Sequence, residues 1–213
     1  MVIGIGNAKA GTGKSALALL LASYLAKKQK MSVYLSGRED RWTLGWLGER
    51  SSLLEHTLPF QYLPCEIGLL GALREKLGAG NNSCMLIELP SDLQHTELIE
   101  AISGLELLIC PFCYDGPTLN ASIYFASLAL RIRPSLPLLF VPNRIIQGAS
   151  YPLKEQADKV LRQIGSLSTP IPSLIGFQRI SSLLLPAGLV ESCSATLDLI
   201  HSQYLSKLKN GKP

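Results

Sequence analysis

The stretch VIGIGNAKAGTGKS, residues 2–15, opens the chain and decides its fold. An apolar run at 2–5 is followed by a glycine-rich loop, which leads into an alanine- and leucine-rich segment at 14–28. This order of strand, loop and helix is typical of a phosphate-binding loop, because small residues let backbone N–H groups approach phosphate oxygens. The helix begins beneath the anion, where its dipole favours negative charge. The stretch therefore predicts a nucleoside triphosphate as the ligand.

Individual residues of the loop have predicted roles. Lys14 brings a cation to the outer phosphates, and the Ser15 hydroxyl is suited to ligate Mg²⁺. The strict pattern G-x-x-x-x-G-K-[ST] has Ala8 in place of its first glycine, so an ordinary glycine-rich turn is the alternative interpretation. The strand before the loop and the helix after it favour the functional one. The predicted nucleotide contacts are Ala10, Gly11, Thr12, Gly13, Lys14, Ser15 and Ala16.

Length and composition indicate one compact domain over residues 1–213. The chain is 47% hydrophobic and 17% charged, which is enough apolar material for a substantial core. Its start lacks the features of a signal peptide, and the longest apolar helical run, residues 17–26, is too short to cross a bilayer. We therefore expect a cytoplasmic protein. The formal net charge of +4 is too modest to identify a partner.

Strand-like and helix-like segments alternate along the chain. The apolar runs lie at 2–5, 32–36, 84–89, 105–110 and 138–141, and the helical patterns lie at 14–28, 68–77, 94–102, 117–131, 152–164 and 186–208. Such alternation predicts an α/β fold with a mostly parallel twisted sheet and helices on both faces. Residues 166–172 are predicted to be a loop.

Ligands of open parallel sheets collect at the carboxyl ends of the strands. The residues to inspect are therefore 36–42, which read SGREDRW, 88–90, which read ELP, and 142–144, which read PNR. Each segment is expected where a phosphate, a metal ion or a base is met.

The five cysteines form no even-numbered disulfide framework, and reduced thiols are expected. Cys110 and Cys113 form a C-x-x-C spacing, but the chain has no second cysteine or histidine pair to complete a zinc site. Redox or metal chemistry and simple burial of small hydrophobic side chains are both left open for this pair.

Taken together, these segments resemble the ParA/MinD family of deviant-Walker ATPases, in order and over nearly the whole chain. Residues 9–15, KAGTGKS, are similar to the family's K-G-G-x-G-K-[ST] motif. The resemblance implies the P-loop NTPase fold, ATP and Mg²⁺ as ligands, and a homodimer in which Lys9 reaches the partner's nucleotide. It also implies that Asn143 and Arg144 lie near adenine.

The departures from the family pattern concern hydrolysis. The second-strand motif D-x-D-P-Q is GREDR at residues 37–41, so the resemblance makes Glu39 the residue that orients the attacking water. Glu88 stands where the family has the aspartate that supports Mg²⁺, and Ala16 replaces a second Ser/Thr. Displacing a water-orienting carboxylate by about 1 Å costs on the order of 100-fold in rate. Nucleotide binding with weak or altered ATP hydrolysis is the expectation.

The resemblance also suggests partners. ParA-type relatives bind DNA non-specifically through basic residues, and the candidates in this chain are Lys154, Lys159, Arg162, Arg179, Lys207, Lys209 and Lys212. Glu155 with Lys159, and Asp158 with Arg162, have i,i+4 spacing, so a solvated helix face is the competing interpretation. A small stimulating partner protein is expected as well.

The resemblance thus implies a ParA-like ATPase that helps to partition plasmid, chromosomal or other cargo, and three alternatives stay open. The first is a nucleotide switch or adaptor without turnover, and the second is a small-molecule ligase or kinase resembling dethiobiotin synthetase. The third is a MinD-like regulator bound to membranes through the apolar stripe of residues 197–208, although a last helix packed on its own domain explains that stripe better.

Overall fold

The computed structural model describes residues 1–38, 43–66, 68, 71–72, 82–92 and 94–206. Its centre is a seven-stranded sheet with the order β3-β2-β4-β1-β5-β6-β7, and all neighbouring strands run parallel. The predicted parallel α/β architecture is thus confirmed. The strands are β1 (Val2–Ile5), β2 (Ser32–Ser36), β3 (Gln61–Tyr62), β4 (Ser83–Glu88), β5 (Leu107–Phe112), β6 (Leu138–Pro142) and β7 (Ser166–Leu167).

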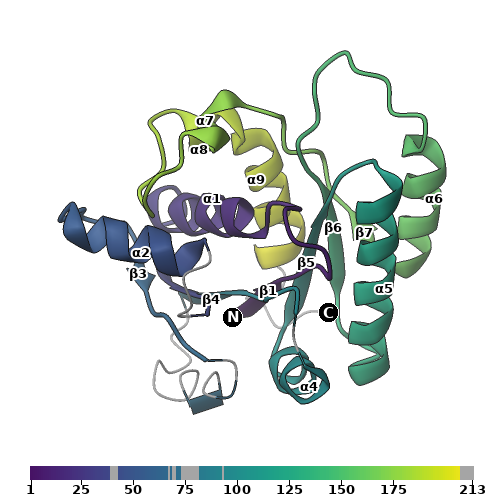
Figure 1. Ribbon diagram of the computed structural model, residues 1–213, viewed down its shortest axis with the longest axis horizontal. Coiled ribbons are helices and arrows are strands. Elements are labelled where there is room, and N and C mark those ends of the chain that lie inside the picture. The colour runs from purple at the N-terminus through teal and green to yellow at the C-terminus, as the bar shows by residue number, and fades with distance from the viewer. Residues whose placement is uncertain (39–42, 67, 69–70, 73–81, 93, 207–213) are drawn as a thin grey trace.

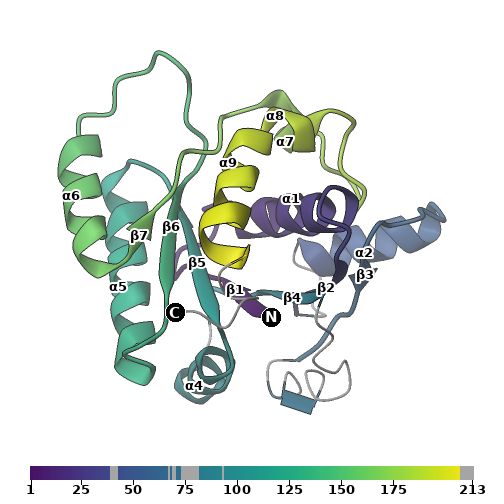
Figure 2. The same cartoon turned by 180° about the vertical axis from the view of Figure 1, so that it is seen from behind.

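Helices cover both faces of the sheet, as Figures 1 and 2 show from opposite sides. One face carries α1 (Lys14–Lys27), α2 (Leu44–Leu53), α7 (Ile175–Gln178), α8 (Leu189–Ser192) and α9 (Ser194–Ile200). The other carries α4 (His95–Ser103), α5 (Gly116–Ile132) and α6 (Lys154–Ile164). The layered arrangement leaves the carboxyl ends of the strands as the edge where loops and ligands meet.

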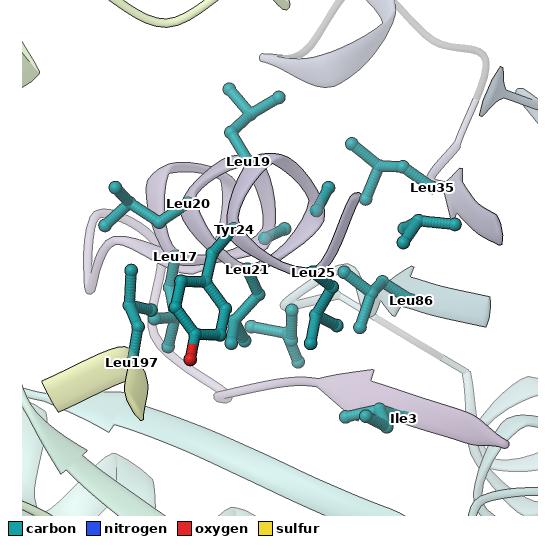
Figure 3. Packing of buried hydrophobic residues seen from close by; sticks show 14 of the residues in the cluster. Ile3, Leu17, Leu19, Leu20, Leu21, Tyr24, Leu25, Leu35, Leu86 and Leu197 are labelled. Atoms are coloured by element: carbon teal, nitrogen blue, oxygen red, sulfur yellow. The ribbon is translucent and has the colours of Figure 1, made fainter. Parts of the chain in front are cut away.

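Alternation within the strands builds two cores. Ile3 and Ile5 of β1 belong to the cluster under α1, whereas Val2 belongs to the cluster on the opposite face. Strands buried on both sides need apolar side chains at every position, which explains why the sequence shows continuous apolar runs instead of alternation. Figure 3 shows Leu17, Leu21 and other side chains of α1 packed against the sheet and Leu197.

Strand β5 differs from its predicted bounds of 105–110. It begins at Leu107 and runs through Pro111 to Phe112. Because Gly6 N donates to Ile109 O, the odd-numbered residues of β5 direct their backbone groups toward β1. β1 ends at Ile5, so the missing N–H of Pro111 breaks no hydrogen bond of the ladder.

The predicted long helix at 186–208 is wrong in its continuity. Gly188 has a left-handed backbone (φ 78°), so helix α8 begins only after it. Cys193 (φ −107°, ψ 3°) is non-helical and separates α8 from α9, and residues His201–Leu205 continue α9 as a π-helical turn. Among the described residues, four elements were not predicted: α2, α7 and the two-residue strands β3 and β7, the last within the expected loop. Most of the predicted helix at 68–77 lies outside the described residues.

The C-terminal apolar stripe packs on the domain. Leu197, Ile200 and Leu205 are fully buried in the core beneath α1, and the Tyr24 hydroxyl of α1 donates to Asp198. This burial favours the packing interpretation of the stripe over membrane attachment. Over the described part of the chain, the helices are too short or too polar to span a bilayer.

Candidate functional site

The predicted phosphate-binding loop connects β1 to α1 at the carboxyl edge of the sheet. Gly11 (φ 77°) and Gly13 (φ 96°) adopt the left-handed conformation that glycine tolerates best. A Cβ atom on Gly13 would lie 2.0 Å from Asn143 Nδ2, so this position has no room for a side chain. Gly13 cannot cap α1 with a side chain, and the first turn of the helix carries no acidic residue. An anion is the natural partner for this helix end.

Two buried amides hold the loop in place. Asn7 Oδ1 accepts a hydrogen bond from Lys9 N at 2.9 Å, and Asn7 Nδ2 donates to Pro111 O (2.9 Å) and Ser122 Oγ (2.7 Å). β5 extends past the end of β1, and there the Asn7 side chain donates the hydrogen bond to Pro111 O that a longer β1 would provide. From the other side, Asn143 Nδ2 donates to the carbonyl of Thr12 at 2.8 Å.

Lys14 is a buried cation at the start of α1. Its Nζ atom donates to Ser91 Oγ at 2.6 Å and to the carbonyl of Lys9 at 3.4 Å, and both acceptors are neutral. Burial lowers the pKa of Lys14, while the charges of Glu88 and Asp92 act in the opposite direction. An anion beside this ammonium would relieve part of its desolvation.

Ser15 and Glu88 meet across the site. The Ser15 hydroxyl donates to Glu88 Oε1 at 2.6 Å, which joins the first turn of α1 to the carboxyl end of β4. A hydroxyl next to a carboxylate is an oxygen donor set of the kind that Mg²⁺ binds together with phosphate oxygens and water. The residues present therefore fit a magnesium ion.

The segment Glu88–Asp92 faces the loop. Its members contact three pocket residues in turn: Glu88 contacts Ser15, Ser91 contacts Lys14, and Asp92 forms an ion pair of 3.0 Å with Arg38. Arg38 follows β2, so this single segment joins the first turn of α1 to the end of the second strand.

An open pocket of about 510 Å³ lies between these elements. Ligand pockets of this order accommodate small organic molecules, nucleotides included. It is lined by Ala10, Gly11, Gly13, Lys14, Ser15, Ala16, Arg38, Thr43, Leu44, Glu88, Pro90, Ser91, Asp92 and Arg144. Eight of these fourteen residues were predicted site residues, and Arg38 and Pro90 lie in segments that were expected near the ligand. Thr43, Leu44, Ser91 and Asp92 were missed; they come from loops and the start of α2.

The remaining predicted site residues have different positions. Asn143 is buried and holds the loop, and Arg144 lines the pocket. Thr12 is buried and contributes its carbonyl to Asn143. Lys9 is exposed to solvent, and Glu39 lies outside the described residues.

The C-x-x-C pair has no metal-binding surroundings in the described chain. Cys110 is fully buried in β5, and burial raises its pKa to about 12. Cys113 is half-buried, and burial also raises its pKa, although the charges of Arg144 and Lys9 lower it. The described residues hold no group of three or more histidine, cysteine and acidic side chains suited to a metal ion. Buried, protonated thiols agree with the packing interpretation.

On α6, the charged residues do pair along the helix, as the interpretation of a solvated helix face expects, but Asp158 pairs with Lys154. The two side chains lie 3.0 Å apart, and Asp158 also accepts a hydrogen bond from the Tyr114 hydroxyl.

Comparison with known proteins shows the fold. No protein-family model matches the sequence, and no curated protein matches it significantly. Solved structures do match over nearly their full length. A proposed plasmid partition protein from Borrelia burgdorferi bound to AMPPNP is 14% identical, with a TM-score of 0.68 over 95% of this chain and 98% of that one.

Two structures that contain MinD give the same result. The MinC:MinD complex of Aquifex aeolicus matches with 16% identity and a TM-score of 0.71 over 94% of both chains. MinD of Pyrococcus horikoshii complexed with Mg-ADP matches with 19% identity and a TM-score of 0.68 over 98% of both chains. The protein therefore has a P-loop NTPase fold. Within that class, its architecture is that of the ParA/MinD-type ATPases.

Proposed function

We propose that this protein is a Mg²⁺-dependent ATP-binding protein of the ParA/MinD type, which dimerises on nucleotide and positions DNA or other cargo. The observation that carries the proposal is the meeting of Lys14, Ser15 and Glu88 in one pocket at the N-terminus of an uncapped helix. The structural neighbours that hold AMPPNP and Mg-ADP support the choice of ligand.

Each group in the loop has a separate role in binding the nucleotide. Backbone N–H groups at the start of α1 bind phosphate oxygens, and Lys14 offsets the charge of the outer phosphates. Ser15 supplies a hydroxyl for the metal ion, and Glu88 orients that hydroxyl from the opposite side. Mg²⁺, when bound, neutralises charge on the phosphate oxygens. Arg144 lines the pocket and is the candidate contact for the adenine or ribose.

Weak or altered hydrolysis follows from the departures around the pocket. Glu39 is the proposed water-orienting carboxylate, one methylene longer than the family's aspartate. The first aspartate of that motif corresponds to Gly37, and a Cβ atom on Gly37 would lie 3.1 Å from Leu44 Cδ1. A side chain at this position therefore requires a small shift of Leu44. Because Gly37 provides no carboxylate, a nucleotide switch with lost turnover is the second candidate function.

The proposal also includes a dimer and partners outside the pocket. Lys9 is exposed beside the pocket, as a residue that reaches another subunit must be. The MinC:MinD complex shows a protein of this fold with a partner protein. Non-specific DNA binding is assigned to the basic residues of α6 together with Arg179 and the C-terminal lysines.

The binding step is tested by calorimetric titration of ATP with and without Mg²⁺. Wild-type protein is expected to bind in the presence of Mg²⁺, and Lys14→Ala is expected to lose at least about 100-fold in affinity because a buried charge-assisted contact is removed. Absence of Mg²⁺-dependent binding by the wild type overturns the proposal, and equal affinity of Lys14→Ala overturns the site assignment.

The later steps need separate assays. Sedimentation with ATP compares wild type with Lys9→Ala, and loss of an ATP-dependent dimer in the variant supports the role of Lys9 in the partner's site. Phosphate release in the presence of DNA distinguishes the two candidate functions: turnover abolished by Glu39→Ala supports the ATPase, and absence of turnover supports the switch.

A further inference from the structure

Arg38 and Asp92 form an ion pair inside the proposed nucleotide pocket. The Arg38 guanidinium lies 3.0 Å from Asp92 Oδ1, and both residues line the pocket. Neither belongs to the phosphate-binding loop, since Arg38 follows β2 and Asp92 follows β4. A cation that lines a pocket for a polyanion can bind a phosphate as well as a carboxylate.

The position of Arg38 relative to Lys14 indicates which end of the pocket it serves. Lys14 Nζ donates to Ser91 Oγ, and Arg38 pairs with the next residue, Asp92. Partners that are adjacent in sequence bring the two cations to the same end of the pocket. Lys14 serves the outer phosphates in a loop of this kind, so Arg38 lies at that end as well.

The exposure of the two side chains makes this pair exchangeable. The Asp92 side chain is 73% exposed and the Arg38 side chain only 30%. Asp92 therefore remains solvated after release, whereas Arg38 stays at the pocket wall. Exposed ion pairs are weak, and a phosphate accepts two parallel hydrogen bonds from a guanidinium with greater strength.

We infer that Arg38 binds the terminal phosphate of the nucleoside triphosphate and that Asp92 holds Arg38 in place until the nucleotide arrives. This inference rests on the proposed function. Arg38 is a binding residue in it, and Asp92 is a positioning residue that acts through Arg38. Arrival of the phosphate exchanges one acceptor for another, without change in the loop that holds the remaining phosphates.

The test is a double-mutant cycle measured by calorimetric titration of ATP and ADP in the presence of Mg²⁺. Arg38→Gln is expected to weaken ATP binding by about tenfold or more and ADP binding by less than about threefold. Asp92→Asn is expected to tighten ATP binding by about two- to fivefold, because its competition for Arg38 is removed. In the Arg38→Gln background the same change is expected to have a clearly smaller effect, because only the direct repulsion between Asp92 and the nucleotide is then removed.

The cycle separates the inference from simple repulsion. If Asp92 only repels the anionic nucleotide, Asp92→Asn tightens binding equally with and without Arg38, and the inference is overturned. Equal losses for ATP and ADP in Arg38→Gln, or no loss of ATP affinity, overturn it too.

Asp158→Asn is the matched control, because it removes an ion pair of the same length on α6 that does not line the pocket. Its ATP affinity is expected to equal that of the wild type. Failure of the proposed function is a different result, in which the wild-type protein does not bind ATP at all.

Discussion

The two sides of the proposed nucleotide site are held by different kinds of bond. The loop at residues 7–15 is fixed by buried amides, with Asn7 tied to β5 and α5 and Asn143 tied to the carbonyl of Thr12. The opposing segment, Glu88–Asp92, is held to β1 by the backbone bond from Leu89 N to Ile5 O, but it contacts the pocket residues Ser15, Lys14 and Arg38 through side chains. Its side chains accept hydrogen bonds from Ser15, Lys14 and Arg38, which are the groups that a metal ion and phosphates would bind.

This difference indicates that one wall is preformed and the other exchanges partners. Buried hydrogen bonds to backbone groups are costly to break, because each broken bond leaves a polar atom without a partner in the protein interior. Contacts at a pocket rim are replaced by ligand or water at little cost. Substitutions on the two walls therefore have effects of different size on stability.

The largest effect on stability is expected for Asn7→Ala on the preformed wall. The change removes three hydrogen bonds and leaves Pro111 O and Lys9 N unsatisfied, so the free energy of unfolding falls by about 2–4 kcal/mol. Urea unfolding measures it. Asn82→Ala is the control. It removes an exposed hydrogen bond of 2.8 Å from the Asn82 side-chain amide to Lys30 O and is expected to cost less than about 1 kcal/mol. Equal losses of unfolding free energy in the two variants would contradict the conclusion that Asn7 holds a preformed wall.

The second prediction concerns Lys14, which lies between the two walls, and here the expected change in the free energy of unfolding has the opposite sign. Lys14→Met keeps the alkyl chain and removes the buried charge, so the free energy of unfolding of the nucleotide-free protein is expected to rise by about 0.5–2 kcal/mol. Lys27→Met, at the exposed end of the same helix, loses a favourable interaction with the helix dipole and is expected to cost a few tenths of a kcal/mol.

The pH dependence of the Lys14→Met effect follows from the direction of the pKa shift. The folded protein has a lowered pKa for Lys14, so the unfolded chain binds more protons between that pKa and 10.5. The advantage of the variant over wild type is therefore complete below the folded-state pKa of Lys14, shrinks as the pH rises from that pKa to 10.5, and then stays constant. An advantage that grows with pH contradicts the assignment of burial as the dominant cause.

The smallest effect is expected for Ser91→Ala on the exchangeable wall. Lys14 loses a neutral acceptor at the pocket rim and takes water in its place, so the free energy of unfolding changes by less than about 1 kcal/mol. The affinity for ATP stays within about threefold of wild type, because a phosphate would displace this contact in any case. A loss of stability as large as that of Asn7→Ala would place Ser91 in the preformed wall.

The sequence predicted the fold well because its strongest signals are local. Continuous apolar runs mark the central strands, and the glycine loop leads directly into α1. The short strands β3 and β7 span two residues each and are too brief for a periodic pattern. Helix α2 carries two glycines, which lower its helical propensity and conceal it.

The site was predictable only where the loop itself provides the residues. The support from Asn7 depends on β5 extending past β1, which is a matter of register between strands far apart in sequence. Asn143 was expected near the base, but its burial directs it to the Thr12 carbonyl. Ser91 and Asp92 have no motif of their own, and only the fold brings them against Lys14 and Arg38.

A structure of the protein with AMPPNP and Mg²⁺ would show which wall of the site is preformed. Residues 7–15 are expected to keep their backbone within about 1 Å, with Lys14 and Ser15 on the phosphates and the metal ion. Arg38 is also expected to leave Asp92 for the terminal phosphate. A nucleotide bound outside this pocket, or a loop that rearranges while the segment Glu88–Asp92 keeps all its contacts, would contradict these expectations.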